Sequence, residues 1–242
     1  MARLFGLTSK QPVDLLLTFP PSASHGWGVA WYDEQGKQTV KKDRRSALDP
    51  ASNQEITVNA LTKQCIVHTR IATSGTVSKQ NAHPFSYKNY TFAHNGSVHK
   101  ERLLEKLHAP YNEKFESEPI DSEVYFRLIV QAIEESDPKD GIRRATAFAN
   151  DDRGSSFLLA DGETLYAYCF GIPLYFIRWD LQKPLHMVSK HTGSVIQSDQ
   201  LRDVLAVIVS SERFTEDNWH ALDDGELLIV QENMEYEVVN LV

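Results

Sequence analysis

The chain has only two cysteines in 242 residues, Cys65 and Cys169, and each lies within an apolar, strand-like run. A free thiol in such a run usually serves as a small buried hydrophobic side chain. The low count argues against a disulfide framework and favours a reducing compartment. The sequence therefore predicts a cytoplasmic protein.

Long hydrophobic runs and stretches of one charge are also scarce. No segment approaches the length that spans a bilayer, so no membrane partner is expected. The formal net charge is -8, because acidic residues are scattered along the chain, while basic residues cluster only at positions 41–45. This distribution disfavours a nucleic-acid partner, whose phosphates attract basic surfaces.

The composition is that of a globular protein, with 41% hydrophobic and 24% charged residues, and predicts a single domain over residues 1–242. Residue patterning predicts helices at 100–107, from about Ser122 onwards with Asp121 as the N-cap, and at 142–149. We expect strands before and after them, at 3–7, 27–32, 64–69, 91–94, 156–160, 164–170, 174–179, 205–210, 226–231 and 235–240. Strands, then helices, then strands indicate an α+β fold rather than alternating βαβ units. Residues 109–119 are expected to form a long surface loop.

One stretch, "HTRIATSG" at residues 68–75, gives the first indication of a site. An apolar run at 65–67 ends in His68, Thr69 and Arg70 and then gives way to small polar residues and a glycine. This pattern indicates a buried strand that delivers a guanidinium group to the rim of a site.

Four further clusters interrupt apolar surroundings. They are "HGWG" (25–28), "NAHPF" (81–85), "AHNG" (93–96) and "DSE" (121–123). Together with "HTRIATSG", their order and spacing resemble the class II glutamine amidotransferases, whose glutaminase domain is an N-terminal-nucleophile hydrolase. "SSERF" (210–214), Trp219 and "DGELLIV" (224–230) are similar to the stand-alone, single-domain bacterial members.

The resemblance implies a fold and a reaction. The fold would be a four-layer α/β/β/α sandwich, with two antiparallel sheets between helices. The reaction would be hydrolysis of the amide of glutamine or another γ-glutamyl compound, which needs no cofactor or metal. Partners beyond that small-molecule substrate, a second copy of the chain or a synthase, stay open.

The resemblance also implies roles for individual residues. Arg70 would bind the substrate α-carboxylate, since a guanidinium can do so through two parallel hydrogen bonds, and Thr73 would add a hydroxyl donor. Asp121 would accept from the α-ammonium group. Asn95 and Gly96 would supply the side-chain amide and the backbone N–H of an oxyanion hole. His83 would lie near the substrate, with no contact assigned.

The nucleophile itself is missing. In this family the initiator methionine is removed and a cysteine becomes the first residue, whereas this chain begins "MARLFG" and has Ala2 at that position. A methyl group cannot attack a carbonyl, so the chain should bind its substrate and not cleave it. Either the cysteine was replaced deliberately, or this is a natural relative that lost the chemistry. The main alternative function is a γ-glutamyl-binding pseudoenzyme that acts as a sensor or as a partner subunit.

Taken one at a time, these residues have simpler explanations. Arg70 alone would be a surface ion-pair partner, Asp121 a helix cap, and Asn95 with Gly96 a hairpin turn. Their joint order is what favours a site. His68, His83 and His94 raise a metal site as a further alternative, but the spacing of metal ligands is lacking. His68 and His94 are expected to be core strand residues held by hydrogen bonds.

Overall fold

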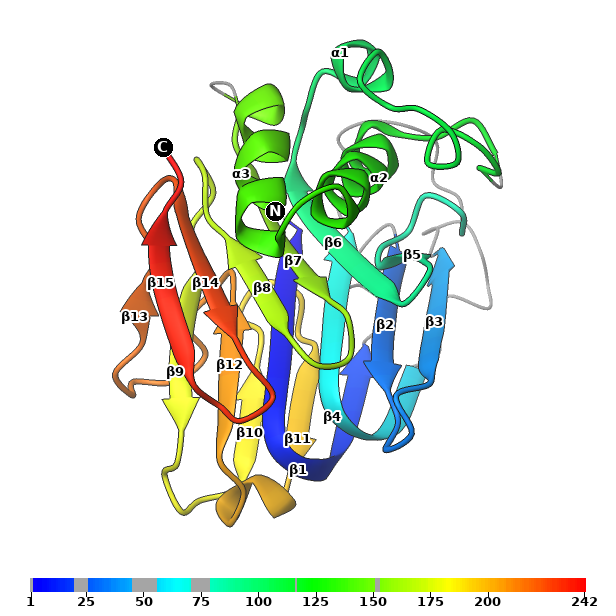
Figure 1. The fold of residues 1–242 in the computed structure, drawn as a ribbon. Coiled ribbons are helices and arrows are strands. Elements are labelled where there is room, and N and C mark those ends of the chain that lie inside the picture. The colour runs from blue at the N-terminus through cyan, green and yellow to red at the C-terminus, as the bar shows by residue number, and fades with distance from the viewer. Residues whose placement is uncertain (1, 20–25, 45–55, 71–78, 116, 151–152) are drawn as a thin grey trace.

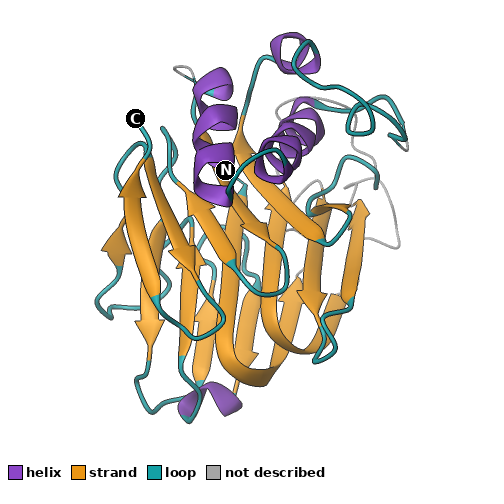
Figure 2. Cartoon of the chain, viewed as in Figure 1, coloured by secondary structure: helices purple, strands orange, loops and turns teal. Residues whose placement is uncertain are grey.

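The computed structural model describes residues 2–19, 26–44, 56–70, 79–115, 117–150 and 153–242. In these ranges two β-sheets stack face to face, and helices cover the smaller sheet (Figures 1 and 2). The strand pairs are antiparallel throughout. The fold is therefore the predicted α+β sandwich; of its two predicted helical layers, the described ranges contain the one on the smaller sheet.

The larger sheet has nine strands, and its main path runs β13-β9-β12-β1-β4-β2-β3, with β11 pairing both β1 and β10. Its strands are β1 (Arg3–Phe19), β2 (Gly26–Tyr32), β3 (Gln38–Arg44), β4 (Ile56–Arg70), β9 (Tyr175–Trp179), β10 (Leu185–Val188), β11 (Val195–Ser198), β12 (Ala206–Ser210) and β13 (His220–Ala221). The first strand, β1, thus lies in the middle of the sheet, between β12 and β4.

The smaller sheet has six strands in the order β15-β14-β8-β7-β6-β5. They are β5 (Phe85–Tyr87), β6 (Tyr90–Gly96), β7 (Ser155–Ala160), β8 (Leu165–Tyr168), β14 (Glu226–Val230) and β15 (Tyr236–Asn240). Leu4 and Ile66 of the larger sheet share a buried cluster with Leu158 and Leu165 of the smaller one. Tyr32 also joins the layers, because its buried hydroxyl donates to the Ala160 carbonyl at 2.8 Å.

Three helices, α1 (Lys100–Leu104), α2 (Asp121–Glu134) and α3 (Pro138–Ala149), pack on the outer face of the smaller sheet. The ring of Phe126 on α2 stacks on Phe92 of β6, with ring centroids 5.2 Å apart. Helix α3 begins with the expected signals, since Asp137 accepts from the Asp140 N–H at 3.1 Å and Pro138 follows it. None of the helices in the described ranges is long and apolar enough to cross a bilayer.

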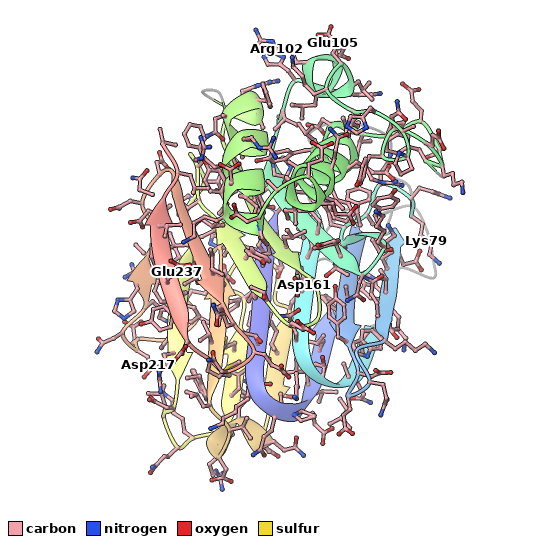
Figure 3. All side chains as sticks on the ribbon, in the orientation of Figure 1. Lys79, Arg102, Glu105, Asp161, Asp217 and Glu237 are labelled. Carbon is pink, nitrogen blue, oxygen red and sulfur yellow. The ribbon has the colours of Figure 1, made fainter. Side chains whose placement is uncertain are left out.

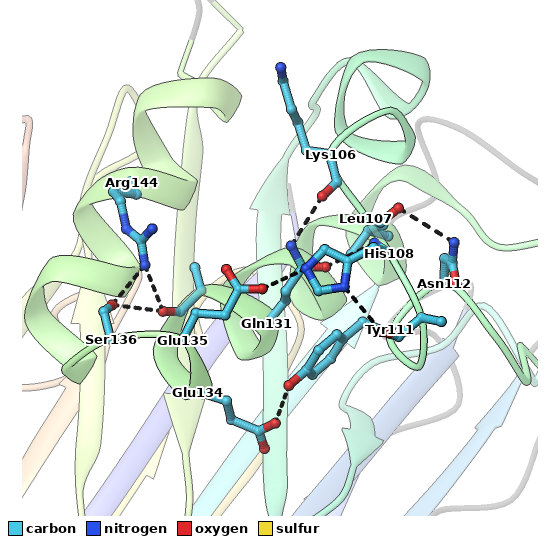
Figure 4. A network of polar contacts seen from close by, with 12 residues as sticks. Lys106, Leu107, His108, Tyr111, Asn112, Gln131, Glu134, Glu135, Ser136 and Arg144 are labelled. Carbon is cyan, nitrogen blue, oxygen red and sulfur yellow. Dashed lines mark hydrogen bonds and ion pairs between the residues drawn. The ribbon is translucent and has the colours of Figure 1, made fainter.

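The segment between α1 and α2 is fastened to α2 by polar contacts (Figure 4). The His108 N–H donates to Gln131 Oε1 and Gln131 Nε2 donates to the Lys106 carbonyl, each at 3.1 Å. His108 Nε2 also lies 2.6 Å from Glu135 Oε1, and Tyr111 donates to Glu134. The predicted loop is therefore held against the helix whose first residue is Asp121.

Each predicted helix and strand is present, although several have different ends. The patterning missed β3, β5, β10, β11 and β13, which are short or lie at sheet edges. The predicted N-cap at Asp121 is wrong by one position: Ile120 is the cap, without a side-chain hydrogen bond, and Asp121 is the first helical residue.

Among the described residues, β10, β11 and the 3₁₀ segment η2 (Gln200–Arg202) contribute to the cluster on the outer face of the larger sheet.

Candidate active site at the amino terminus

The beginning of β1 lies between two of the segments that the sequence singled out. Arg3 pairs with Thr69 at the end of β4, and Phe5 pairs with Ser210 at the end of β12. Leu4 N–H donates to Ser211 Oγ and the Ser211 N–H donates to the Leu4 carbonyl, both at 3.0 Å. The "HTR" and "SSER" segments therefore flank the start of the chain.

Arg70 is the last residue of β4 and pairs with Gly26 of β2. Its backbone follows Thr69, the partner of Arg3, so it lies at the same end of the sheet as Ala2. The Arg70 side chain, Thr73 and His25 lie outside the described residues. The predicted contacts of Arg70 and Thr73 with a substrate thus remain predictions.

Asn95, on β6 of the smaller sheet, contacts both the start of the chain and β4. Its Nδ2 donates to the Ala2 carbonyl oxygen at 3.2 Å, and its Oδ1 lies 3.2 Å from His68 Nε2. The two contacts fix the orientation of the amide, and they require His68 to carry its proton on Nε2. Asn95 is 5% exposed, so the amide is held in place and directs its N–H groups towards the amino terminus.

Gly96 follows Asn95 with a φ of +128°, a conformation open to glycine. A Cβ at this position would lie 2.1 Å from the Gly154 carbonyl oxygen. The same carbonyl accepts from the Ser97 N–H at 3.2 Å. Gly96 therefore allows the backbone to turn sharply beside Asn95 and to pack against the turn before β7.

The "DSE" motif at the head of α2 is joined to the "HNG" segment. Asp121 Oδ2 accepts from the Val98 N–H at 3.2 Å, while its Oδ1 accepts from the Ser122 N–H at 2.9 Å. His94 Nδ1 lies 2.9 Å from Ser122 Oγ, and burial lowers the pKa of His94 to about 3. The neutral His94 ring thus fastens the first turn of α2 to β6.

His83 is buried behind His68. The centroids of the two rings lie 4.5 Å apart, and the His83 carbonyl faces Gly28, where a Cβ would approach to 2.1 Å. This contact explains the second glycine of "HGWG". His68 contacts Asn95, so His83 reaches the oxyanion-hole candidate through one intervening side chain, that of His68.

A groove of about 720 Å³ opens beside Asp121. It is lined by residues of the segments before β5, after β6 and before α2, among them Gln80, Asn81, Ser97, Val98, Ser117 and Asp121. Asp121 therefore borders a space large enough for a small amino-acid derivative.

The matches to known proteins agree with this geometry. A sequence model of the class-II glutamine amidotransferases matches residues 1–240. The chain belongs to this family. It is similar to "Putative glutamine amidotransferase YafJ" of Escherichia coli (strain K12), with 27% identity over 194 residues that cover 70% of this chain and 73% of that protein.

Two solved structures share the fold of this amidotransferase. A predicted glutamine amidotransferase from Pseudomonas aeruginosa superposes with a TM-score of 0.73 and 21% identity, covering 98% of each chain. The glutamine phosphoribosylpyrophosphate amidotransferase of B. subtilis superposes with a TM-score of 0.59 and 17% identity. The match covers 95% of this chain and 49% of that one.

Sequence reasoning missed one ion pair of this amidotransferase. Arg3 Nε lies 3.1 Å from Glu212 Oε2, and the two side chains are 11% and 10% exposed. Glu212 belongs to "SSERF", a segment that contributes only to the family resemblance. The available signal is an acidic residue two positions after the buried strand β12, which ends at Ser210. The pair fastens the residue next to Ala2 to the end of β12.

The cysteines and histidines lie as the sequence predicts. Cys65 and Cys169 are free and buried, and burial raises the pKa of the Cys65 thiol to about 12. Both predicted hydrogen-bonded strand histidines, His68 and His94, are confirmed as such. Within the described part of the chain, no three histidine, cysteine or acidic side chains are grouped as metal ligands.

Proposed function

We propose that this class II amidotransferase binds glutamine or another γ-glutamyl compound at the amino terminus, in a site built for amide hydrolysis. The observation that carries the proposal is the hydrogen bond from Asn95 Nδ2 to the Ala2 carbonyl. It supports an amide held beside the position from which a nucleophile would attack, with one N–H on the Ala2 carbonyl and the second N–H as the proposed donor to the oxyanion. Donors fixed in this way stabilise the oxyanion that develops during acyl transfer.

In this proposal each remaining residue takes one part of the substrate. Asn95 and the Gly96 N–H form the oxyanion hole, while Arg70 and Thr73 bind the α-carboxylate. Asp121 accepts from the α-ammonium group. Two backbone N–H groups already bind its carboxylate, but two oxygens offer about four acceptor sites, so capacity remains for a ligand. His83 acts indirectly, by packing against the histidine that orients Asn95.

The chain as it stands then binds and does not cleave, because Ala2 offers no nucleophile. Removal of Met1 would expose an α-amino group with a pKa of about 7.7–8.0, which in a cysteine form serves as the base. Loss of a nucleophile that works within a catalytic unit costs on the order of 10⁶ in turnover.

The decisive experiment compares the chain with its Ala2→Cys variant, after mass spectrometry has established that Met1 is removed from both. Ammonia release from glutamine is expected from the variant alone. Calorimetry on the unaltered chain should detect glutamine binding that Arg70→Ala abolishes. Ammonia release from neither form, with binding retained, would instead support a γ-glutamyl sensor or partner subunit, the alternative that Ala2 itself favours. Unchanged affinity after Arg70→Ala would refute the role of that side chain.

A further inference from the structure

The "SSE" segment at residues 210–212 contacts the start of the chain through each of its three residues, and we call it the SSE clamp. Ser210 Oγ and the Ser211 N–H both donate to the Leu4 carbonyl, at 3.2 and 3.0 Å. Ser211 Oγ accepts from the Leu4 N–H at 3.0 Å. The Glu212 carboxylate pairs with Arg3. The clamp therefore holds both backbone polar groups of Leu4 and the side chain of Arg3.

The clamp extends beyond the regular pairing of β1 with β12. That pairing joins five pairs of residues, from Phe5 with Ser210 to Ser9 with Ala206. The contacts of the clamp with Arg3 and Leu4 come before this register, on the side of Ala2. Because five residue pairs already join the two strands, the added contacts act mainly on the residues that directly follow Ala2.

The acidic residue of the clamp depends on Arg3 for its counter-charge. Both carboxylate oxygens of Glu212 are buried and accept no hydrogen bond from the described residues, so the ion pair with Arg3 Nε, 3.1 Å from Oε2, is their main compensation. The next basic group, His191 Nε2, lies 3.7 Å away on a side chain that is 59% exposed. A buried carboxylate that loses its counter-charge is strongly unfavourable. The pair thus restrains Arg3, the residue after Ala2.

Leu4 also links the clamp to the oxyanion-hole candidate. On the side opposite β12, Leu4 pairs with His68 of β4. His68 Nε2 contacts Asn95 Oδ1, and Asn95 Nδ2 donates to the Ala2 carbonyl. The contacts form a closed path from Leu4 through His68 and Asn95 back to Ala2. Residue 2 and the amide beside it are therefore both held relative to Leu4.

A nucleophile at the end of a chain needs such an anchor for a physical reason. It is connected to the protein on one side only, and terminal residues are poorly ordered unless they are tied down. Ala2 precedes β1, whose first residue is Arg3. Misplacing a reacting group by about 1 Å can cost about 10² in rate. The residues directly after the nucleophile are where an anchor fixes it best, and the clamp acts on these residues.

We propose that Ser211 and Glu212 are positioning residues for an amino-terminal nucleophile, which they hold in place through Leu4 and Arg3. The inference rests on the proposed function, because it concerns the hydrolysis that a cysteine at position 2 would perform. Side chains alternate along a strand, so Arg3 lies on the face of the sheet opposite to Leu4, which packs between the sheets. The ion pair is thus turned away from Asn95, and substrate binding does not depend on it.

Kinetics in the Ala2→Cys background test the proposal. Ser211→Ala and Glu212→Gln should each lower kcat for ammonia release from glutamine by about 10–10²-fold, while KM changes less than about twofold. Circular dichroism gives the folded fraction, to which kcat is normalised. In the chain that keeps Ala2, the same substitutions should leave the affinity for glutamine within about twofold by calorimetry. Ser211→Ala removes no charge, so it decides the test if Glu212→Gln fails to fold.

Leu201→Ala is the control for a loss of stability alone. Leu201 is fully buried in η2, at the far end of the sheet from the start of β1 (Figure 1), so the substitution destabilises the fold and should leave the normalised kcat unchanged. An active Ala2→Cys parent whose kcat survives the clamp substitutions, or falls equally in Leu201→Ala, would overturn the positioning role alone. No ammonia release from the Ala2→Cys parent would overturn the proposed function and this role together.

Discussion

Asn95 Nδ2 and the Ala2 carbonyl oxygen are joined by a 3.2 Å hydrogen bond across the two sheets. His68 Nε2 binds the opposite end of the same amide, so the amide cannot turn away from the amino terminus without losing both contacts. The larger sheet supplies Ala2 and His68, and the smaller sheet supplies Asn95. Stacking of the sheets therefore creates this arrangement, which neither sheet could form alone.

In the Ala2→Cys background, Asn95→Ala should lower kcat for glutamine hydrolysis by about 10²–10³, with little change in KM. Removing one oxyanion-hole donor costs this much because the donor acts mainly on the transition state. Steady-state ammonia release measures both constants. Asn59→Ala, on the exposed face of β4, is the control and should match the parent. A kcat unchanged by Asn95→Ala would remove Asn95 from the oxyanion hole.

Thiol labelling should distinguish position 2 from the two native cysteines. Cys65 and Cys169 are buried, and burial raises the pKa of both thiols, so the reactive thiolate is scarce at neutral pH. The folded chain should therefore resist iodoacetamide, while Ala2→Cys should take up one label, located by peptide mass spectrometry. Denaturation should expose both native thiols. Rapid labelling of Cys65 in the folded chain would contradict its burial.

Gly96→Ala should destabilise the fold more than Gly36→Ala, although both glycines have positive φ. The new methyl group at position 96 would meet the Gly154 carbonyl at 2.1 Å, whereas nothing lies within 4 Å of the Cβ position at Gly36. Gly36→Ala is the control, and it should lower the free energy of unfolding by about 1–2 kcal/mol because of the left-handed backbone alone. Gly96→Ala should cost about 1–3 kcal/mol more, because backbone must shift. Urea unfolding measures both, and equal losses would show that the turn relaxes freely.

Much of this arrangement was predictable from the sequence, for identifiable reasons. The strand before "HTR" and the helix after Asp121 are buried elements, and the continuous apolar run of the strand and the helical spacing of apolar residues in the helix are strong signals. Edge strands such as β3 and β13 lack that pattern, because one or both of their faces meet solvent. The N-cap assignment failed because Asp121 resembles a cap, yet its carboxylate binds the Val98 N–H from the neighbouring segment.

Contacts between distant segments were not predictable in the same way. Glu212 follows a buried strand, but nothing in its local sequence indicates Arg3 as its partner, 209 residues earlier. Likewise, the role of Gly28 depends on the His83 carbonyl that packs against it. Such contacts depend on which strands become neighbours, and strand order follows from the whole fold.

Glu212→Gln should lower the free energy of unfolding by about 3 kcal/mol, because it leaves the guanidinium of Arg3 largely buried without its counter-charge. Glu237→Gln provides the matched control, since the Lys139–Glu237 pair is about half exposed and should cost less than about 1 kcal/mol. Figure 3 labels Glu237 on the outer strand β15. Denaturant unfolding of both variants measures the difference. Equal, small losses would show that Arg3 finds another partner.

His94 should make the protein less stable in acid. Burial lowers its folded-state pKa to about 3, whereas the unfolded chain titrates near the ordinary value of 6.5. Between these values the unfolded state binds a proton that the folded state does not, so stability rises with pH across this window and levels off above it. From pH 7.5 to pH 5 this histidine alone should cost about 2 kcal/mol, at 1.36 kcal/mol per unit below the unfolded pKa.

The measurement compares urea unfolding of the parent and His94→Gln at both pH values. Gln can still bond to Ser122 but does not titrate, so the variant should be less stable at pH 7.5, where ring packing on Tyr125 is lost, and should lose about 2 kcal/mol less on acidification. Other histidines and carboxylates contribute equally to both proteins and cancel in the difference. Identical pH dependence in the two proteins would mean that His94 is protonated without unfolding, and that Ser122 and the first turn of α2 move to admit the charge.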